Sequence, residues 1–247
     1  MRERLGSLRV LCVSVVNPGP TPDSKPNSDP RPQPDSMPIP DRDASLEHWL
    51  DAIATPAPAP GGGAAAAIAG ALSAALVQMV AGLTAGREKY AAVHDLCVRA
   101  SEKAERLRDG MLALAARDAR AFEAFTRALA MPAGASDERE RRARAKADAL
   151  AAGAAVQLEL LAQLAQVAEL SLELAEQGLA TAVGDSATAA FLAVGGARSA
   201  YWSVRGNLAE VGGGIADRER LGAAKVLLER VEGAERRVRH LLEARVP

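Results

Sequence analysis

From Ala44 onward, apolar residues recur every three or four positions, which is the spacing of one face of an α-helix. The pattern predicts six helices, at about 46–53, 64–83, 87–131, 136–177, 185–210 and 216–244. Ser45, Ser136 and Asp185 are the candidate N-caps. Few runs are rich in β-branched or aromatic residues, so no sheet is expected. Long helices joined by short turns predict an all-α antiparallel bundle.

The segment 64–83 is apolar on every face and consists mainly of Ala and Gly. At about 20 residues it is long enough to cross a bilayer. However, Ala and Gly are only weakly hydrophobic on insertion scales, and the segment contains Ser73 and Gln78. We therefore expect no membrane association, and instead a buried central helix whose small side chains let its neighbours approach closely.

One carboxylate interrupts the apolar face of the helix expected at 87–131. That face comprises Tyr90, Val93, Cys97, Ala100, Ala104, Leu107, Met111, Leu114, Phe122, Phe125 and Leu129. Asp118 falls four residues after Leu114 and four before Phe122, on the same face. A buried carboxylate is unfavourable unless it is paired or hydrogen-bonded. Two interpretations stay open: a salt bridge with a neighbouring Arg, or a carboxylate that lines a pocket and serves as a base.

Three consecutive glycines, Gly61, Gly62 and Gly63, open the expected central helix. Without side chains they leave the backbone N–H groups of a helix N-terminus open to an anion or to the polar edge of a ligand. The spacing GxGxxG and a preceding strand are both absent, which excludes a dinucleotide fingerprint. A plain helix start or linker is the alternative interpretation.

Further candidates lie near helix ends. Lys89 and Tyr90 stand near the start of the helix expected at 87–131, and Asp185 near the start of the helix expected at 185–210. Arg198 and Arg205 are seven residues apart, so they share one helix face that would suit an anionic ligand. Each of these residues also fits an ordinary surface or capping role.

Composition narrows the class of protein. The 247 residues are 49 % hydrophobic but only 3 % aromatic, so the core must consist mainly of Ala, Leu and Val. A net charge of −1 with interspersed signs argues against a nucleic-acid-binding surface. The Cys and His residues lack the spacing of a disulfide framework or a metal site, so we expect no bound metal and a reducing cytoplasm.

Residues 1–43 differ from the rest, with nine prolines between Pro18 and Pro40. A polar, Pro-rich tract buries too little surface to offset its ordering entropy, which predicts a disordered segment followed by one helical domain at 44–247. Met37 is an alternative start just before that domain. Several expected helices exceed about 25 residues, which favours packing against a second subunit.

Three segments carry a resemblance to a known family. The first contains Ser45-Leu46, Trp49-Leu50, Pro58-Ala59-Pro60-Gly61-Gly62-Gly63, Gly86 and Lys89-Tyr90. The second is Asp118-Ala119-Arg120-Ala121-Phe122, and the third contains Gly184-Asp185, Val204-Arg205 and Asn207-Leu208. Together they resemble the formimidoyltetrahydrofolate cyclodeaminase and methenyltetrahydrofolate cyclohydrolase family, over residue 46 to the C-terminus.

The resemblance implies a helical, homodimeric, cytoplasmic enzyme of one-carbon metabolism. Its substrate would be formimidoyl- or 5,10-methenyltetrahydrofolate, with no separate cofactor. The cyclodeaminase reaction releases ammonia, and the cyclohydrolase reaction gives 10-formyltetrahydrofolate. Asp118 would be the general base, and the substrate pocket would comprise Gly61, Gly62, Gly63, Lys89, Tyr90, Asp185, Arg205 and Asn207.

Two stretches depart from the family pattern. Ala64 stands where the family usually has Ser, and 180–184 lacks the amide side chains of the family's Asn-Pro-Asn-like stretch. These departures motivate an alternative interpretation. In it, the chain is a non-catalytic folate-binding or helical interaction protein that retains the fold.

Overall fold

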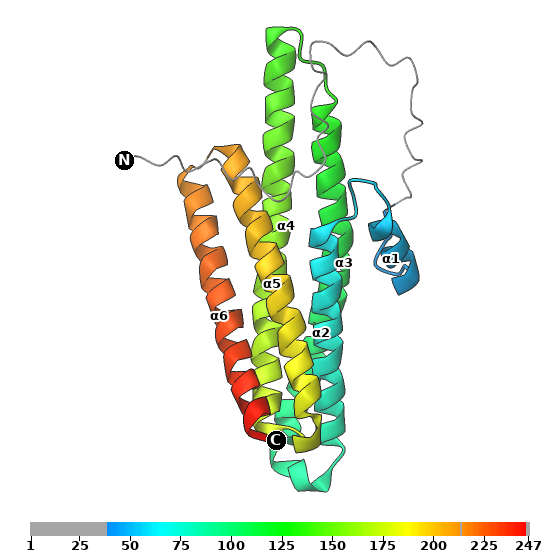
Figure 1. The fold of residues 1–247 in the computed structure, drawn as a ribbon, viewed down its shortest axis with the longest axis vertical. Coiled ribbons are helices and arrows are strands. Elements are labelled where there is room, and N and C mark those ends of the chain that lie inside the picture. The colour runs from blue at the N-terminus through cyan, green and yellow to red at the C-terminus, as the bar shows by residue number, and fades with distance from the viewer. Residues whose placement is uncertain (1–38, 213, 246–247) are drawn as a thin grey trace, which may run out of the picture.

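The computed structural model describes residues 39–212 and 214–245 (Figure 1). Its helical elements are α1 (Leu46–Ala54), α2 (Gly62–Ala85), the 3-10 helix η1 (Glu88–Val93), α3 (His94–Leu129), α4 (Ser136–Gln177), the 3-10 helix η2 (Ala180–Ala182), α5 (Val183–Val211) and α6 (Ile215–Arg245). No strand occurs in these residues. Most of the Pro-rich segment predicted to be disordered lies outside the described range.

Helices α2 to α6 lie side by side and alternate in direction (Figure 1). Helix α4, the longest at 42 residues, contacts α3, α5 and α6, while α2 contacts α3, α5 and α4. The tip of the α3–α4 hairpin projects beyond the start of α2, and α1 lies beside the bundle. The predicted all-α bundle of long helices is confirmed.

The core consists mainly of Ala, Leu and Val, as the composition predicted. Small residues allow close helix approach around Leu164 of α4. A Cβ atom at Gly70 of α2 would lie 2.8 Å from a methyl of Leu164, and one at Gly196 of α5 would lie 3.2 Å from its other methyl. Glycine at both positions therefore brings α2 and α5 against α4.

Helix α2 is buried on one side and exposed on the other. Val77, Val80 and Ala81 are at most 1 % exposed, whereas Leu72 and Met79 are 47 % and 42 % exposed. By length and composition α2 and α4 could cross a membrane, but 56 % and 50 % of their apolar stretches are buried inside the fold. Such burial is typical of core helices in a bundle.

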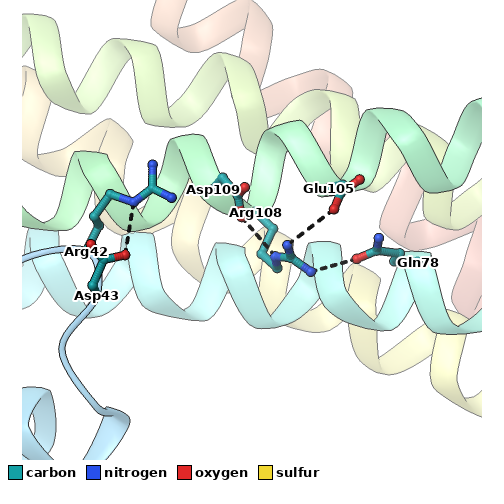
Figure 2. A network of polar contacts seen from close by, with 6 residues as sticks. All are labelled: Arg42, Asp43, Gln78, Glu105, Arg108 and Asp109. Atoms are coloured by element: carbon teal, nitrogen blue, oxygen red, sulfur yellow. Dashed lines mark hydrogen bonds and ion pairs between the residues drawn. The ribbon is translucent and has the colours of Figure 1, made fainter.

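Buried hydroxyl groups and one arginine link neighbouring helices. Ser73 of α2 donates a hydrogen bond to the carbonyl of Ala189 on α5 at 2.6 Å. Figure 2 shows Arg108 of α3 donating to the side-chain oxygen of Gln78 on α2 at 2.9 Å. Arg108 also pairs with Asp109 of its own helix, at 3.0 Å. These bonds fix the register of α2 against both neighbours.

Helix boundaries differ from the prediction in three places. Ser45 caps α1 as expected, because its Oγ accepts the N–H of His48. Ser136 is the first helical residue of α4 and not its cap, since the carboxylate of Glu138 accepts the preceding N–H of Ala135. The prediction that Asp185 caps the next helix was also wrong, because α5 begins earlier, at Val183. The helix expected at 87–131 is divided into η1 and α3, which meet at Val93, and Tyr90 has non-helical torsions within η1.

Arginine side chains of helix α6 form ion pairs and a hydrogen bond with α4. Arg230 pairs with Glu169 at 2.6 Å, and Arg237 pairs with Glu176 at 2.5 Å. Arg245 donates to the carbonyl of Ala175 near the C-terminal end of α4. Because these groups are exposed, each contributes little energy, but their seven-residue spacing aligns the two helices.

Candidate active site

The glycine-rich start of α2 faces the carboxylate of Asp118 on α3. Gly61 is the N-cap and Gly62 is the first helical residue, and Gly61 has no side chain with which to cap this terminus. The backbone N–H of Ala64 instead donates a hydrogen bond to the Asp118 carboxylate. The positive end of the helix dipole therefore lies at a carboxylate of another helix.

Gly63 lies in contact with this carboxylate. A Cβ atom at this position would clash with both carboxylate oxygens of Asp118 and with Nε2 of Gln157. Glycine is required here for close approach, because any side chain would displace the two polar groups.

Gln157 of α4 is the third component of the site. Its Nε2 donates to Oδ1 of Asp118 at 2.6 Å, and its side chain is only 1 % exposed. Its Oε1 is buried without a hydrogen-bond partner among the described residues. Gln157 was not predicted from the sequence, although a signal was present. Gln157 interrupts the buried positions of α4, just as Asp118 interrupts the apolar face of α3.

Burial raises the pKa of Asp118 above its ordinary value, because desolvation penalises the charged form. The hydrogen bonds from Gln157 and from the N–H of Ala64 favour the carboxylate and offset part of this rise. No salt bridge to Asp118 occurs in the part of the chain that the structure describes, since its partner is a neutral amide. Of the two interpretations of Asp118, the salt bridge with an Arg is therefore wrong.

Asn207 of α5 lies at the same end of the bundle. Its Nδ2 is 2.9 Å from the place of a Cβ atom at Gly153, which stands one turn before Gln157 on α4. The methyl group of Ala121, three residues after Asp118 on α3, is 4.0 Å from that place. Helices α2, α3 and α4 thus meet at Asp118, and Asn207 of α5 lies about one helical turn away from the Asp118–Gln157 pair.

Arg205 points elsewhere. Its guanidinium stacks over the ring of Trp202, 5.0 Å from the ring centroid, and both side chains are exposed. Residues two apart on a helix face different directions, so Arg205 does not share the contact of Asn207 with Gly153.

Lys89, Tyr90 and Asp185 lie at the other end of the bundle. The hydroxyl of Tyr90 accepts the N–H of Ala180 at 3.2 Å, and the Lys89 ammonium is 5.8 Å from the centroid of the Tyr90 ring. Asp185 is in the first turn of α5, directly after η2. The intervening α2 has 24 residues and is therefore about 36 Å long (Figure 1). One chain does not bring these residues to Asp118.

The described residues contain no cluster of three His, Cys, Asp or Glu side chains suited to a metal ion. The fold and the site define a class: an all-α bundle with a partly buried carboxylate held between a helix N-terminus and a buried amide.

Comparisons with known proteins identify the family to which this helical bundle belongs. Residues 45–220 match the formiminotransferase-cyclodeaminase family. The chain is 34 % identical to the methenyltetrahydrofolate cyclohydrolase of Methylorubrum extorquens over 202 residues, which are 82 % of this chain and 97 % of that protein. It is 30 % identical to rat formimidoyltransferase-cyclodeaminase over 169 residues, 68 % of this chain and 31 % of the rat protein.

A solved structure shares the fold. The crystal structure of formiminotetrahydrofolate cyclodeaminase from Thermotoga maritima matches with a TM-score of 0.75 and 28 % identity, covering 83 % of this chain and 98 % of that one. The chain belongs to the formiminotransferase-cyclodeaminase family, whose relatives named here are cyclohydrolase or cyclodeaminase enzymes of folate metabolism.

Proposed function

We propose that this protein acts on formimidoyl- or 5,10-methenyltetrahydrofolate, with Asp118 as the general base. Family membership supports the substrate class. The single observation that supports the mechanism is the placement of the Asp118 carboxylate between the N-terminus of α2 and the amide of Gln157.

The surroundings of Asp118 suit a base. Burial raises its pKa above the ordinary value, which strengthens it as a proton acceptor. The hydrogen bonds from Gln157 and Ala64 keep the carboxylate in one orientation. A negative charge held at this place would also stabilise a cationic substrate.

The cyclohydrolase reaction follows from these properties. In 5,10-methenyltetrahydrofolate one carbon joins two nitrogens and carries a positive charge. Asp118 takes a proton from water as the water oxygen attacks that carbon. The bond from the carbon to one nitrogen then breaks as the new hydroxyl group loses its proton to become the formyl carbonyl, and the freed nitrogen takes up a proton. The products are 10-formyltetrahydrofolate and one proton.

The cyclodeaminase reaction uses the same carboxylate. The second folate nitrogen attacks the carbon of the protonated formimidoyl group and loses its proton to Asp118. The carbon–nitrogen bond to the former imino group then breaks, and ammonia leaves with that proton. The product is 5,10-methenyltetrahydrofolate. In both reactions Asp118 acts on the proton of the attacking atom.

Substrate binding is assigned to two groups of residues. Gly61, Gly62, Gly63 and Asn207 would contact the reacting part of the folate beside Asp118. Lys89, Tyr90, Asp185 and Arg205 would bind the rest, with Lys89 and Arg205 suited to the anionic glutamyl tail. Because Lys89, Tyr90 and Asp185 lie about one α2 length away, they would join the site only from a second chain.

A homodimer would unite the two groups. Helix α2 exposes Leu72, Met79 and Leu83 on one face, and the adjacent α5 exposes Phe191 and Trp202. Apolar side chains on two neighbouring helices suit a second copy of the chain, and an antiparallel arrangement would place one copy's Asp118 near the other's Tyr90. Covered in this way, α2 would become the buried central helix.

We propose one helical domain at 44–247 preceded by a Pro-rich segment at 1–43, and a cytoplasmic location. The described helices pack through one continuous core, which supports the single domain.

The test is turnover of purified protein with each substrate. Loss of the near-ultraviolet absorbance of 5,10-methenyltetrahydrofolate would report hydrolysis, and its appearance with ammonia from the formimidoyl compound would report deamination. We expect the Asp118→Asn variant to lower kcat by at least about a hundredfold. Binding without turnover in the wild type would favour the non-catalytic alternative, and absence of both would contradict a folate function.

A further inference from the structure

We propose that Gln157 is a positioning residue that holds the Asp118 carboxylate in its charged, reactive orientation. The proposal rests on the function assigned to Asp118 above. It adds a component that the family motifs noted in the sequence do not contain.

The geometry joins three helices at one amide. Gln157 comes from α4, its Nε2 donates to Asp118 of α3, and the same Nε2 faces the Gly63 backbone of α2. Gln157 is only 1 % exposed, so its side chain cannot turn towards solvent. Asp118 is therefore the fixed acceptor for its amide N–H. Removing the amide would free the carboxylate to rotate.

The amide is also incompletely satisfied. Its Oε1 is buried and has no hydrogen-bond partner within the described residues. An unsatisfied buried acceptor costs free energy, and an apolar side chain of similar size would avoid that cost. The hydrogen bond to Asp118, which an apolar side chain could not donate, gives the amide of Gln157 a role that offsets this cost.

Charged neighbours do not duplicate this role. Helix α2 carries no charged residue. On the α3 and α4 sides, Arg117 and Glu159 pair with each other at 2.8 Å, while Arg205 of α5 stacks on Trp202. Arg120, two residues after Asp118, is exposed and faces another direction on α3. The Gln157 amide is thus the side-chain donor seen at Asp118.

The chain offers a matched control. Gln163 lies on the same helix, also faces α3, and also has a buried Oε1 without a partner in the described range. It packs against Gly110 and not against Asp118. Gln157→Leu and Gln163→Leu therefore make the same chemical change between the same two helices, but only the first touches the carboxylate.

The experiment measures the pKa of Asp118 by carboxyl ¹³C NMR in the wild type and in both variants. Asp118→Asn identifies the resonance. We expect Gln157→Leu to move its titration upward by about one pH unit or more, and Gln163→Leu to leave it in place. In turnover, the acidic limb of the pH profile of kcat should move by the same amount, with kcat at neutral pH lowered about tenfold or more.

The outcomes separate the two proposals. An unchanged Asp118 titration in folded Gln157→Leu protein would overturn the role of Gln157, whether or not the wild type turns over. If the titration of Asp118 shifts in Gln157→Leu but the wild type does not turn over, the positioning role is supported and only the proposed function is contradicted. If Gln157→Leu does not fold, Gln157→Met gives the same comparison with a flexible side chain.

Discussion

At the scale of single residues, the site depends on a charge kept in a partly buried place. The fold raises the pKa of Asp118, so the folded protein binds the proton of this carboxyl group more tightly than the unfolded chain does. Stability is therefore lost as the pH rises through the titration of Asp118. Below the ordinary pKa of an aspartate, the carboxyl group is protonated in both the folded and the unfolded chain. The loss of folding stability is then absent.

We accordingly expect Asp118→Asn to be more stable than the wild type at pH 7 while it loses activity. A gain of about 1 kcal/mol is typical of removing such a functional strain, which corresponds to a rise in Tm of roughly 2–4 °C for a chain of this size. Thermal unfolding at pH 7 and near pH 3 is the measurement. A gain that persists at low pH would show that the charge is not its cause.

Gly63 sets how closely the helix terminus approaches Asp118. We expect Gly63→Ala to lower kcat by about tenfold or more, because the new methyl group displaces the carboxylate and the amide of Gln157. Gly222→Ala is the matched control, since a Cβ atom there has nothing within 4 Å. Steady-state kinetics with both variants is the measurement. Equal kcat values would argue against a tight contact between Gly63 and the Asp118 carboxylate.

The sequence identified Asp118 and the glycines because each breaks a local pattern. It could not pair them with Gln157, since the contact joins residues 39 positions apart on different helices. Nor could it separate Lys89 and Tyr90 from Asp118, because the length of α2 places them at opposite ends of the bundle.

At the scale of helices, periodicity predicted the elements well and their ends less well. The apolar pattern placed all six α-helices, because apolar positions at helical spacing recur over several turns. The residues at which helices begin and end depend on single contacts. The carboxylate of Glu138 satisfies the start of α4 in place of Ser136, and Tyr90 adopts non-helical torsions within a good helical pattern.

Close helix packing in the core gives a prediction on α2. Gly70→Ala should destabilise the protein by about 1–3 kcal/mol, because its Cβ atom would lie 2.5 Å from the sulfur of Met111 and 2.8 Å from Leu164. Gly82→Ala, on the same helix with open space around it, should instead stabilise by about 0.5–1 kcal/mol. Chemical denaturation of both variants gives the comparison. A Gly70→Ala protein as stable as Gly82→Ala would disprove tight packing here.

At the scale of the whole molecule, the proposed dimer makes each site composite. Mixing Asp118→Asn with Lys89→Ala protein under subunit exchange should then recover about a quarter of wild-type activity, because half of the dimers are mixed and each has one intact site. Light scattering establishes the dimer itself. Activity no greater than the average of the two variants would place the complete site within one chain.

The link between Ser73 and Ala189 also affects synthesis of the protein. These residues are 116 positions apart, so α2 leaves the ribosome long before α5 exists. At 5–20 residues per second the delay is roughly 6–23 s. During that time an uncharged helix of 24 residues has only part of its apolar surface covered by α3 and α4. The nascent chain is therefore a natural client for chaperones that shield apolar segments, and faster translation of 86–211 would improve its yield.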